Sequence, residues 1–202
     1  MGSAPPPSPP GPHARGGRAA LIDALTALFE QVGPEGFSIA QAARAAGLSS
    51  AAPYKHFADR PAALTAVAQD GMARLGAAMA QAARAQQPPR DKVAAVGLAY
   101  LTFAKRNPGV FRLMFSHKSP GGPDQVLRAI GAQAFGVIVA CVAEALRVPP
   151  QSAPVQDTAL LLWSNVHGLA ALAAEGRMSV YGQTVDDAAL VSRMCEAYLP
   201  LA

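Results

Sequence analysis

The sequence predicts an all-α protein. Hydrophobic residues make up 51% of the 202 residues but aromatic residues only 6%, so the apolar content is mostly Ala, Leu and Val. Ala and Leu favour helix, and no run alternates β-branched or aromatic residues with polar ones, as a half-buried strand would. Prolines and glycines separate apolar segments with helical spacing, which indicates about nine helices.

Three regions are expected along the chain. Residues 1–17 contain six prolines and nothing that could pack into a core, so we expect a disordered tail. Residues 18–62 are expected to form a small helical domain and residues 63–202 a larger one. His13, Arg15 and Arg18 would allow the tail to reach a minor groove of DNA, but a solvated tail is the simpler interpretation.

The first two helices are indicated by an apolar stripe and a cap. From Arg18 to Gln31, apolar residues recur at i, i+3, i+4 and i+7, and Gly33-Pro34 ends this helix. Ser38 is a candidate N-cap for a short second helix, because Gln41 follows three residues later. Gly47 would supply the turn after that helix.

A proline marks the start of the third helix. Pro53 would be damaging in the middle of a helix but costs little in the first turn, so we expect this helix to begin near Ser50. Asp59 then caps a long fourth helix, from Arg60 to about Gln86.

Five further helices are expected beyond Pro88-Pro89. The fifth ends before Asn107-Pro108, because a residue preceding proline resists the α conformation. The seventh and eighth are apolar nearly all round, which indicates burial on more than one side. The ranges are Asp91–Arg106, Gly109–Phe115, Asp124–Arg147, Val155–Ala174 and Asp186–Leu199.

The second and third helices have the layout of a helix-turn-helix, whose second helix lies in the major groove of DNA. Small side chains there would let the helix approach the base edges, and polar or basic ones would meet phosphates. The alternative is an ordinary helical corner with a solvated face. The candidate DNA-binding residues are Ser38, Arg44, Ser49, Ser50, Ala52, Tyr54, Lys55, His56 and Arg60.

Residues 18–75 resemble the N-terminal domain of the TetR family of transcriptional regulators. The resemblance implies a DNA-binding helix-turn-helix. The chain departs from the family pattern at Ala42, Pro53 and Arg60, so no operator sequence is implied. The matching segments are Leu21 to Val32, Gly36-Phe37-Ser38-Ile39, Ala46-Gly47-Leu48-Ser49, Tyr54-Lys55-His56-Phe57, Arg60 and Leu64.

A second constellation is Trp163-Ser-Asn-Val-His167-Gly168, in which the indole and the imidazole lie one helical turn apart. The pair could form the floor of a ligand pocket, or pack in the core with the imidazole bonded to a carbonyl group or to Asn165. The candidate ligand-binding residues are Met72, Leu75, Met79, Phe103, Phe111, Met114, Phe115, Trp163 and His167; each could equally be core.

This constellation, with Tyr100-Leu-Thr-Phe103 and the segment from Asn107 to Phe115, resembles the C-terminal domain of the Trp-His-Gly subgroup of TetR-like regulators. The resemblance implies a homodimer that releases DNA when a small molecule binds. The apolar helix at 155–174 and the amphipathic helix at 186–199 are where we expect the two copies to meet.

Other classes find little support in the sequence. No Ser, Cys or glycine-rich loop stands in a catalytic context, the four histidines lack zinc spacing, and Cys141 and Cys195 suggest reduced thiols. No cofactor or metal is expected, and the longest uncharged apolar run, Ile130 to Ala143, is too short to span a bilayer. We therefore expect a cytoplasmic protein.

The sequence thus predicts a DNA-binding repressor that a small molecule releases from a near-palindromic operator. The net charge is +4, and residues 1–60 hold five basic and four acidic residues, so the DNA contact should be small. The rival hypothesis is a helical carrier or sensor of small molecules whose helix-turn-helix is not functional.

Overall fold

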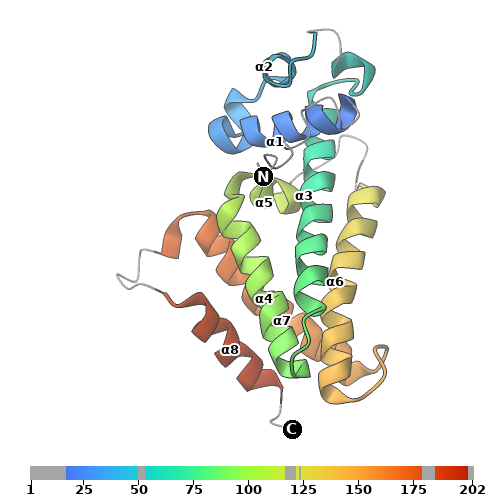
Figure 1. Cartoon of the computed structure of the whole chain (residues 1–202), viewed down its shortest axis with the longest axis vertical. Helices are drawn as coiled ribbons and strands as arrows, with labels where there is room; N and C mark the ends of the chain where they lie inside the picture. The colour runs from blue at the N-terminus through green and yellow to red at the C-terminus, as the bar shows by residue number, and fades with distance from the viewer. Residues whose placement is uncertain (1–16, 50–52, 117–121, 123, 179–184, 200–202) are drawn as a thin grey trace, which may run out of the picture. The chain divides into compact units, whose positions relative to one another are not determined.

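The computed structural model describes residues 17–49, 53–116, 122, 124–178 and 185–199. Within these residues the chain forms eight α-helices, a short 3-10 helix and no strand, which confirms the predicted all-α fold. The elements are α1 (Gly17–Gly36), α2 (Ile39–Ala45), η2 (Pro53–Lys55), α3 (Arg60–Ala83), α4 (Pro89–Arg106), α5 (Pro108–Ser116), α6 (Gln125–Leu146), α7 (Ala153–Ala174) and α8 (Asp187–Tyr198) (Figure 1).

The chain divides into two compact units, Met1–Ala63 and Leu64–Ala202. The core of the first unit is formed by the apolar stripe of α1, which packs against α2. Gly33, with φ 67° and ψ −172°, interrupts α1 just before Pro34. The rings of Phe29 and Phe37 meet edge to face, 5.7 Å apart, so the segment leading into α2 is anchored on α1.

Most helix ends coincide with the residues that predicted them. Asp124 caps α6 by accepting hydrogen bonds from the amides of Val126 and Leu127, at 2.8 and 3.1 Å. Asp186 caps α8 in the same way. Asn107, which precedes Pro108, ends α4. These contacts satisfy amides that a helix start otherwise leaves without partners.

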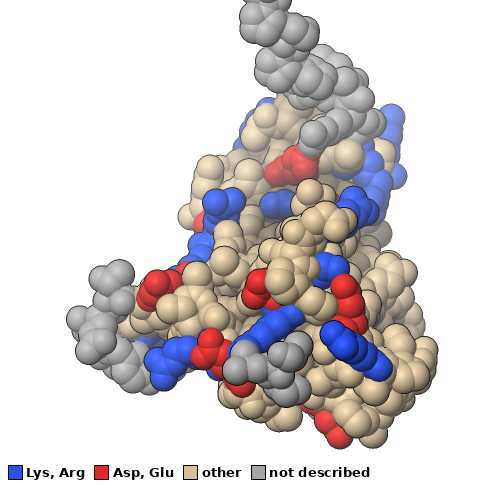
Figure 2. All heavy atoms as spheres, turned by 60° about the horizontal axis from the view of Figure 1, so that its bottom comes forward, with Lys and Arg blue, Asp and Glu red and all other residues tan. Residues whose placement is uncertain are grey.

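In the second unit, α4 packs against α6, α7 and α8 (Figure 1). Its side chains Val93, Val96 and Leu101 are at most 1% exposed. Three ion pairs join α4 to its neighbours at the surface. Lys92 Nζ lies 2.8 Å from Glu144 Oε1 on α6. Towards α8, Lys105 Nζ lies 2.7 Å from Asp187 Oδ1, and Arg90 Nη2 lies 3.9 Å from Glu196 Oε1. Side chains of both signs intermingle over the lower part of the view in Figure 2, as these pairs would require.

One helix is long and apolar enough to cross a membrane by length and composition alone. By length and composition α6 could cross a bilayer, because it has 22 residues and a mean hydropathy of 2.0, although the uncharged run within it is shorter. Here α6 packs against α4 and α7, and Ala134, Ile138 and Val142 are buried. An internal helix of a folded protein passes the same test, so the observation is weak evidence for a membrane.

Candidate nucleic-acid interface and ligand cavity

The glycine turn after α2 is confirmed. Gly47 has a φ of 69°, the left-handed conformation that glycine adopts without a steric penalty. Its N–H donates to Arg44 O at 3.0 Å, and the Leu48 N–H donates to Ala43 O at 2.9 Å. This pair of bonds is the Schellman motif, which satisfies the last carbonyls of a helix. At the other end of α2, Ser38 Oγ accepts from the Gln41 amide at 3.4 Å, as predicted for an N-cap.

The second helix of the motif is described only in part. Residues 50–52, where we expect this helix to begin, lie outside the described residues. The described part is η2, where the amides of His56 and Phe57 both donate to Pro53 O at 2.9 Å. Asp59 Oδ1 then accepts from the Ala62 amide at 2.8 Å and caps α3, as the sequence predicts.

Two buried residues fix this turn in the first unit. Pro53 is among the fully buried side chains and Phe57 is 3% exposed. The Arg18 guanidinium lies 5.6 Å from the centre of the Phe57 ring, a distance typical of a cation–π contact. Pro53 and Phe57 thus anchor the turn in the core of the first unit, and the side chains between them remain on the surface.

Six predicted DNA-binding residues lie on the surface of the first unit. Tyr54 is 62% exposed, so its hydroxyl group is accessible to a partner. Ser50 and Ala52 lie outside the described residues. The other exposed members of the predicted set are Arg44, Ser49, Lys55, His56 and Arg60.

Two predicted DNA-binding residues already serve the fold. The Arg60 guanidinium donates to the carbonyl oxygen of Pro34, so it ties the start of α3 to the end of α1. Ser38 is half-buried as the cap of α2. The Ser38 hydroxyl proton and the other guanidinium N–H groups of Arg60 would still be available to phosphates.

The second unit contains a cavity of about 320 Å³ between α3, α4, α5, α6 and α7. This volume is at the lower end of the range for ligand pockets, about 300–1,000 Å³. Five predicted ligand-binding residues line it: Met72, Leu75, Met79, Phe115 and Trp163. The other lining residues are Tyr100, Gly131, Ala132, Ala134, Phe135 and Leu160.

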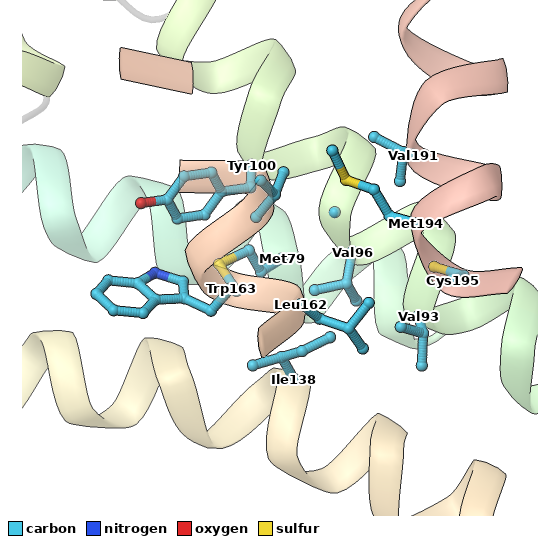
Figure 3. A pocket seen from close by; sticks show the side chains of 12 residues that line it. Met79, Val93, Val96, Tyr100, Ile138, Leu162, Trp163, Val191, Met194 and Cys195 are labelled. Atoms are coloured by element: carbon cyan, nitrogen blue, oxygen red, sulfur yellow. The ribbon is translucent and has the colours of Figure 1, made fainter. Parts of the chain in front are cut away.

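A second, much smaller void of about 30 Å³ lies between α4, α7 and α8 and is shown in Figure 3. It is lined by apolar side chains such as Val96 and Val191, and by Cys195. Met79, Tyr100 and Trp163 line both spaces, so these three side chains form the partition between the cavity and the void.

One polar atom of the partition, the hydroxyl oxygen of Tyr100, bonds to His167. Tyr100 Oη lies 2.8 Å from His167 Nδ1. Burial raises the pKa of Tyr100, an effect that a hydrogen bond from Trp163 partly opposes. Burial lowers the pKa of His167, so at neutral pH the imidazole is uncharged and its Nδ1 can accept the tyrosine proton. Asn165, the alternative partner considered for His167, instead donates to Leu161 O at 2.8 Å.

Two more predicted residues belong to the aromatic cluster around His167. The His167 ring lies 4.5 Å from Phe115, 5.3 Å from Trp163 and 5.6 Å from Phe111, measured between ring centres. Phe111 is 2% exposed and meets the Tyr100 ring edge to face. His167 and Phe111 therefore support the cavity wall from behind.

The last two predicted ligand-binding residues lie elsewhere in the second unit. Met114 is buried where α5 approaches Gly71 of α3. Phe103 lines an open groove between α3 and α4 and lies under the Arg74 guanidinium, 6.0 Å from ring centre to Cζ. Neither side chain is among those that line the cavity.

Six cavity residues are missing from the set that the sequence suggested, and the three with large side chains are Tyr100, Phe135 and Leu160. Tyr100 lies one turn before Phe103, so helical spacing places both on the same side of the helix. Spacing alone does not show which of the two lines the cavity. Phe135 and Leu160 belong to helices that are apolar nearly all round, which leaves no periodic signal to identify the face toward the cavity.

Comparison with families and solved structures gives consistent matches, whereas comparison with curated protein sequences gives none. A protein of unknown function from Rhodococcus sp. RHA1 is 31% identical, with a TM-score of 0.75 over 94% of this chain and 97% of that one. A TetR family transcriptional regulator from Thermus thermophilus is 17% identical, with a TM-score of 0.62 over 89% and 96%. The transcriptional regulator FadR of Bacillus subtilis, solved with stearoyl-CoA, is 14% identical, with a TM-score of 0.64 over 90% and 97%.

Two family models divide the chain between them. Residues 21–67 match the model described as bacterial regulatory proteins of the tetR family. Residues 93–198, more than half of the chain, match the model of the tetracyclin repressor-like C-terminal domain. With the capped helix-turn-helix in the first unit and the helical second unit, these matches show that the chain belongs to the TetR family of DNA-binding transcriptional regulators.

Proposed function

We propose that this regulator is a homodimeric repressor whose two helix-turn-helix units bind the halves of a near-palindromic operator. The observation that carries the proposal is the surface of the first unit, where Tyr54, Lys55 and His56 follow the Gly47 turn and are exposed. In this model the nine candidate DNA-binding residues bind DNA, with Tyr54 and Lys55 on phosphates and the small side chains near base edges.

The second copy would dock on α7 and α8. Support comes from three large apolar side chains of α7 that stay on the surface: Leu160, Leu161 and Leu172 are 52%, 46% and 37% exposed. Large apolar side chains left exposed on one helix are characteristic of protein interfaces. A two-fold arrangement of these helices would form a four-helix contact, and the symmetry of the dimer would match that of the operator.

Release of DNA would follow from a small molecule in the 320 Å³ cavity. Such a ligand must bind the released state more tightly than the DNA-bound state, by about 1–3 kcal/mol for a typical allosteric coupling. The stearoyl-CoA complex of the similar FadR protein supports a ligand site in this fold. The Trp163-to-Gly168 string supports the Trp-His-Gly subgroup, in which we place the chain together with a cytoplasmic, non-catalytic role.

A gel-shift assay with the DNA that flanks the gene tests this function. We expect a complex that weakens as salt rises, because phosphate contacts release counterions. The double variant Lys55→Ala/His56→Ala should bind this DNA at least about tenfold more weakly. The matched control is Arg84→Ala. It removes an exposed charge that directly follows α3 in the second unit, so this variant should bind DNA like the wild type.

The outcomes separate the repressor from a small-molecule carrier. Failure of the wild type to shift the DNA at low salt would contradict the proposed function. A carrier would show saturable binding of a small molecule and form no complex with operator DNA. Both assays are needed because the cavity could bind a small molecule in either kind of protein.

A further inference from the structure

We propose that the cavity binds a neutral, mainly aromatic molecule of about two rings, and that it rejects carboxylates and other charged ligands. The proposal rests on the proposed function, because it assigns a ligand class to the same cavity. The argument uses three properties of the described lining residues: their charge, their hydrogen bonds and their shape.

Charge is the first property. None of the described residues that line the cavity carries an ionisable group other than the Tyr100 hydroxyl. Burial raises the Tyr100 pKa, so this group stays uncharged at neutral pH. A carboxylate or ammonium group placed inside the cavity, away from the rim where Phe115 and Leu160 are 42% and 52% exposed, would lose its hydration without gaining an ionic partner, which strongly disfavours binding.

Hydrogen bonding is the second property. The cavity is lined by only two polar side chains among the described residues, Tyr100 and Trp163, and these bond to each other and to His167. The indole N–H donates to the tyrosine oxygen, and Tyr100 Oη forms a second hydrogen bond with His167 Nδ1. One hydrogen-bonding position of this hydroxyl group remains in either tautomer of His167, so a ligand can form at most one hydrogen bond with it.

The walls are the third property. Phe115, Phe135 and Trp163 contribute three aromatic rings, and Phe135 meets Trp163 edge to face at 6.0 Å between ring centres. Met72 and Met79 face the cavity from α3. Ring edges and thioether sulfur atoms are favourable neighbours for a planar aromatic ligand.

The volume sets the size. An engineered protein cavity of about 150 Å³ binds benzene, so about 320 Å³ suits a compound of two rings. The neighbouring 30 Å³ void would accept a methyl-sized substituent if Met79 changed its rotamer, because Met79 lines the cavity as well as the void, where Figure 3 labels it.

The test compares three probes on the full chain: naphthalene, 2-naphthoate and decanoate. Binding is followed by calorimetry and by the shift in Tm, and Trp163 gives a local signal because it is the only tryptophan of the chain. We expect saturable naphthalene binding that changes the Trp163 emission, at least about 30-fold tighter than binding of either anion.

A matched pair of α6 variants locates the probe. In Gly131→Leu the new side chain enters the cavity, and its Cβ would meet only Met72 at 3.8 Å, an ordinary contact. In Gly136→Leu the Cβ meets nothing within 4 Å and the site is exposed. We expect Gly131→Leu to bind naphthalene at least about tenfold more weakly than the wild type, and Gly136→Leu to bind it with unchanged affinity. If Gly131→Leu does not fold, Ala132→Leu occupies the same wall.

Three results would overturn the inference: no naphthalene binding, equal affinity for 2-naphthoate, or tighter binding of decanoate. Naphthalene binding that Gly131→Leu or Ala132→Leu leaves unchanged would also overturn it. The gel shift of the same preparation is scored separately, so loss of DNA binding with intact naphthalene binding would contradict the repressor and leave the ligand class standing.

Discussion

Gly47 is the residue on which the helix-turn-helix depends most directly. Its φ of 69° places it in a region that costs other L-residues about 1–2 kcal/mol. Gly47→Ala should therefore lower the free energy of unfolding by about 1 kcal/mol and weaken DNA binding further, because the turn sets the direction of η2. Urea denaturation and gel shifts measure the two effects.

The control for Gly47 is a glycine with ordinary helical geometry. Gly136 lies within α6, and an added Cβ there meets nothing within 4 Å. Gly136→Ala should leave stability unchanged or raise it by up to about 1 kcal/mol, because alanine favours helix. Equal losses in both variants would show that the left-handed turn is not the cause.

His167 should make stability depend on pH. Burial lowers its pKa in the folded protein below the value of about 6.5 expected in the unfolded chain. Well above about pH 6.5, His167 is unprotonated in both the folded and the unfolded state, so it does not lower the free energy of unfolding. As the pH falls toward the folded pKa, only the unfolded chain takes up the proton, so stability is lost.

The variant His167→Gln isolates this contribution. Between about pH 7.5 and 5.5 the wild type should lose more unfolding free energy than the variant, because the other histidines are common to both proteins. Denaturant melts at the two pH values give the comparison. Parallel losses in wild type and variant would contradict the assignment.

At the scale of elements, α5 packs unusually close to α3 in the second unit. A Cβ added to Gly71 would lie 2.4 Å from Val110 Cγ1 and 2.9 Å from Met114 Sδ. Gly71→Ala should therefore cost about 1–3 kcal/mol of stability through overpacking. Thermal or urea unfolding of the single variant gives the size of the effect.

A double variant tests the cause. Val110→Ala removes the atom nearest to the new Cβ, so Gly71→Ala/Val110→Ala should lose less stability than the two single variants together. A strictly additive result would mean that the close approach of α5 and α3 is not what makes Gly71 necessary.

Helix ends could be predicted from the sequence because each depends on neighbouring residues. Ser38, Gly47, Asp124 and Asp186 each act within about four residues along the chain, and each was found at its expected end. The third helix stays a prediction at its start, because the residues near Ser50 lie outside the described residues, and its described part is the 3-10 turn Pro53–Lys55 before the cap at Asp59.

The cavity could be predicted only in part because it depends on contacts between distant segments. The α3 methionines, Phe115 and Trp163 were found from spacing and residue type. The bond between Tyr100 and His167 joins residues 67 positions apart, and no local pattern shows it. Phe103 lies one helical turn from Tyr100, so the sequence spacing predicts the same position for both. In the structure Phe103 instead lines the groove beside Arg74.

At the scale of the whole molecule, we infer from the weak charge of the DNA-binding segment that DNA binding requires the proposed dimer. Residues 1–60 hold only one more basic than acidic residue, so a single unit would gain little from phosphate contacts. We expect sedimentation at micromolar concentration to give a dimer. Replacing Leu161 and Leu172 by Glu should shift it toward monomer, because both side chains are on the surface of α7.

The monomeric variant would also bind operator DNA weakly, although its helix-turn-helix is unchanged. Both half-sites contribute to affinity only when the two units are joined. A monomeric wild type would contradict the proposed assembly.

Nuclease footprinting of the DNA that flanks the gene tests the central claim most directly. The account predicts two protected segments related by inverted repeat symmetry, about one turn of DNA or more from centre to centre. Both segments should lose protection together in Lys55→Ala/His56→Ala and remain protected in Arg84→Ala. Absence of protection at low salt, or protection of one unpaired segment, would contradict it.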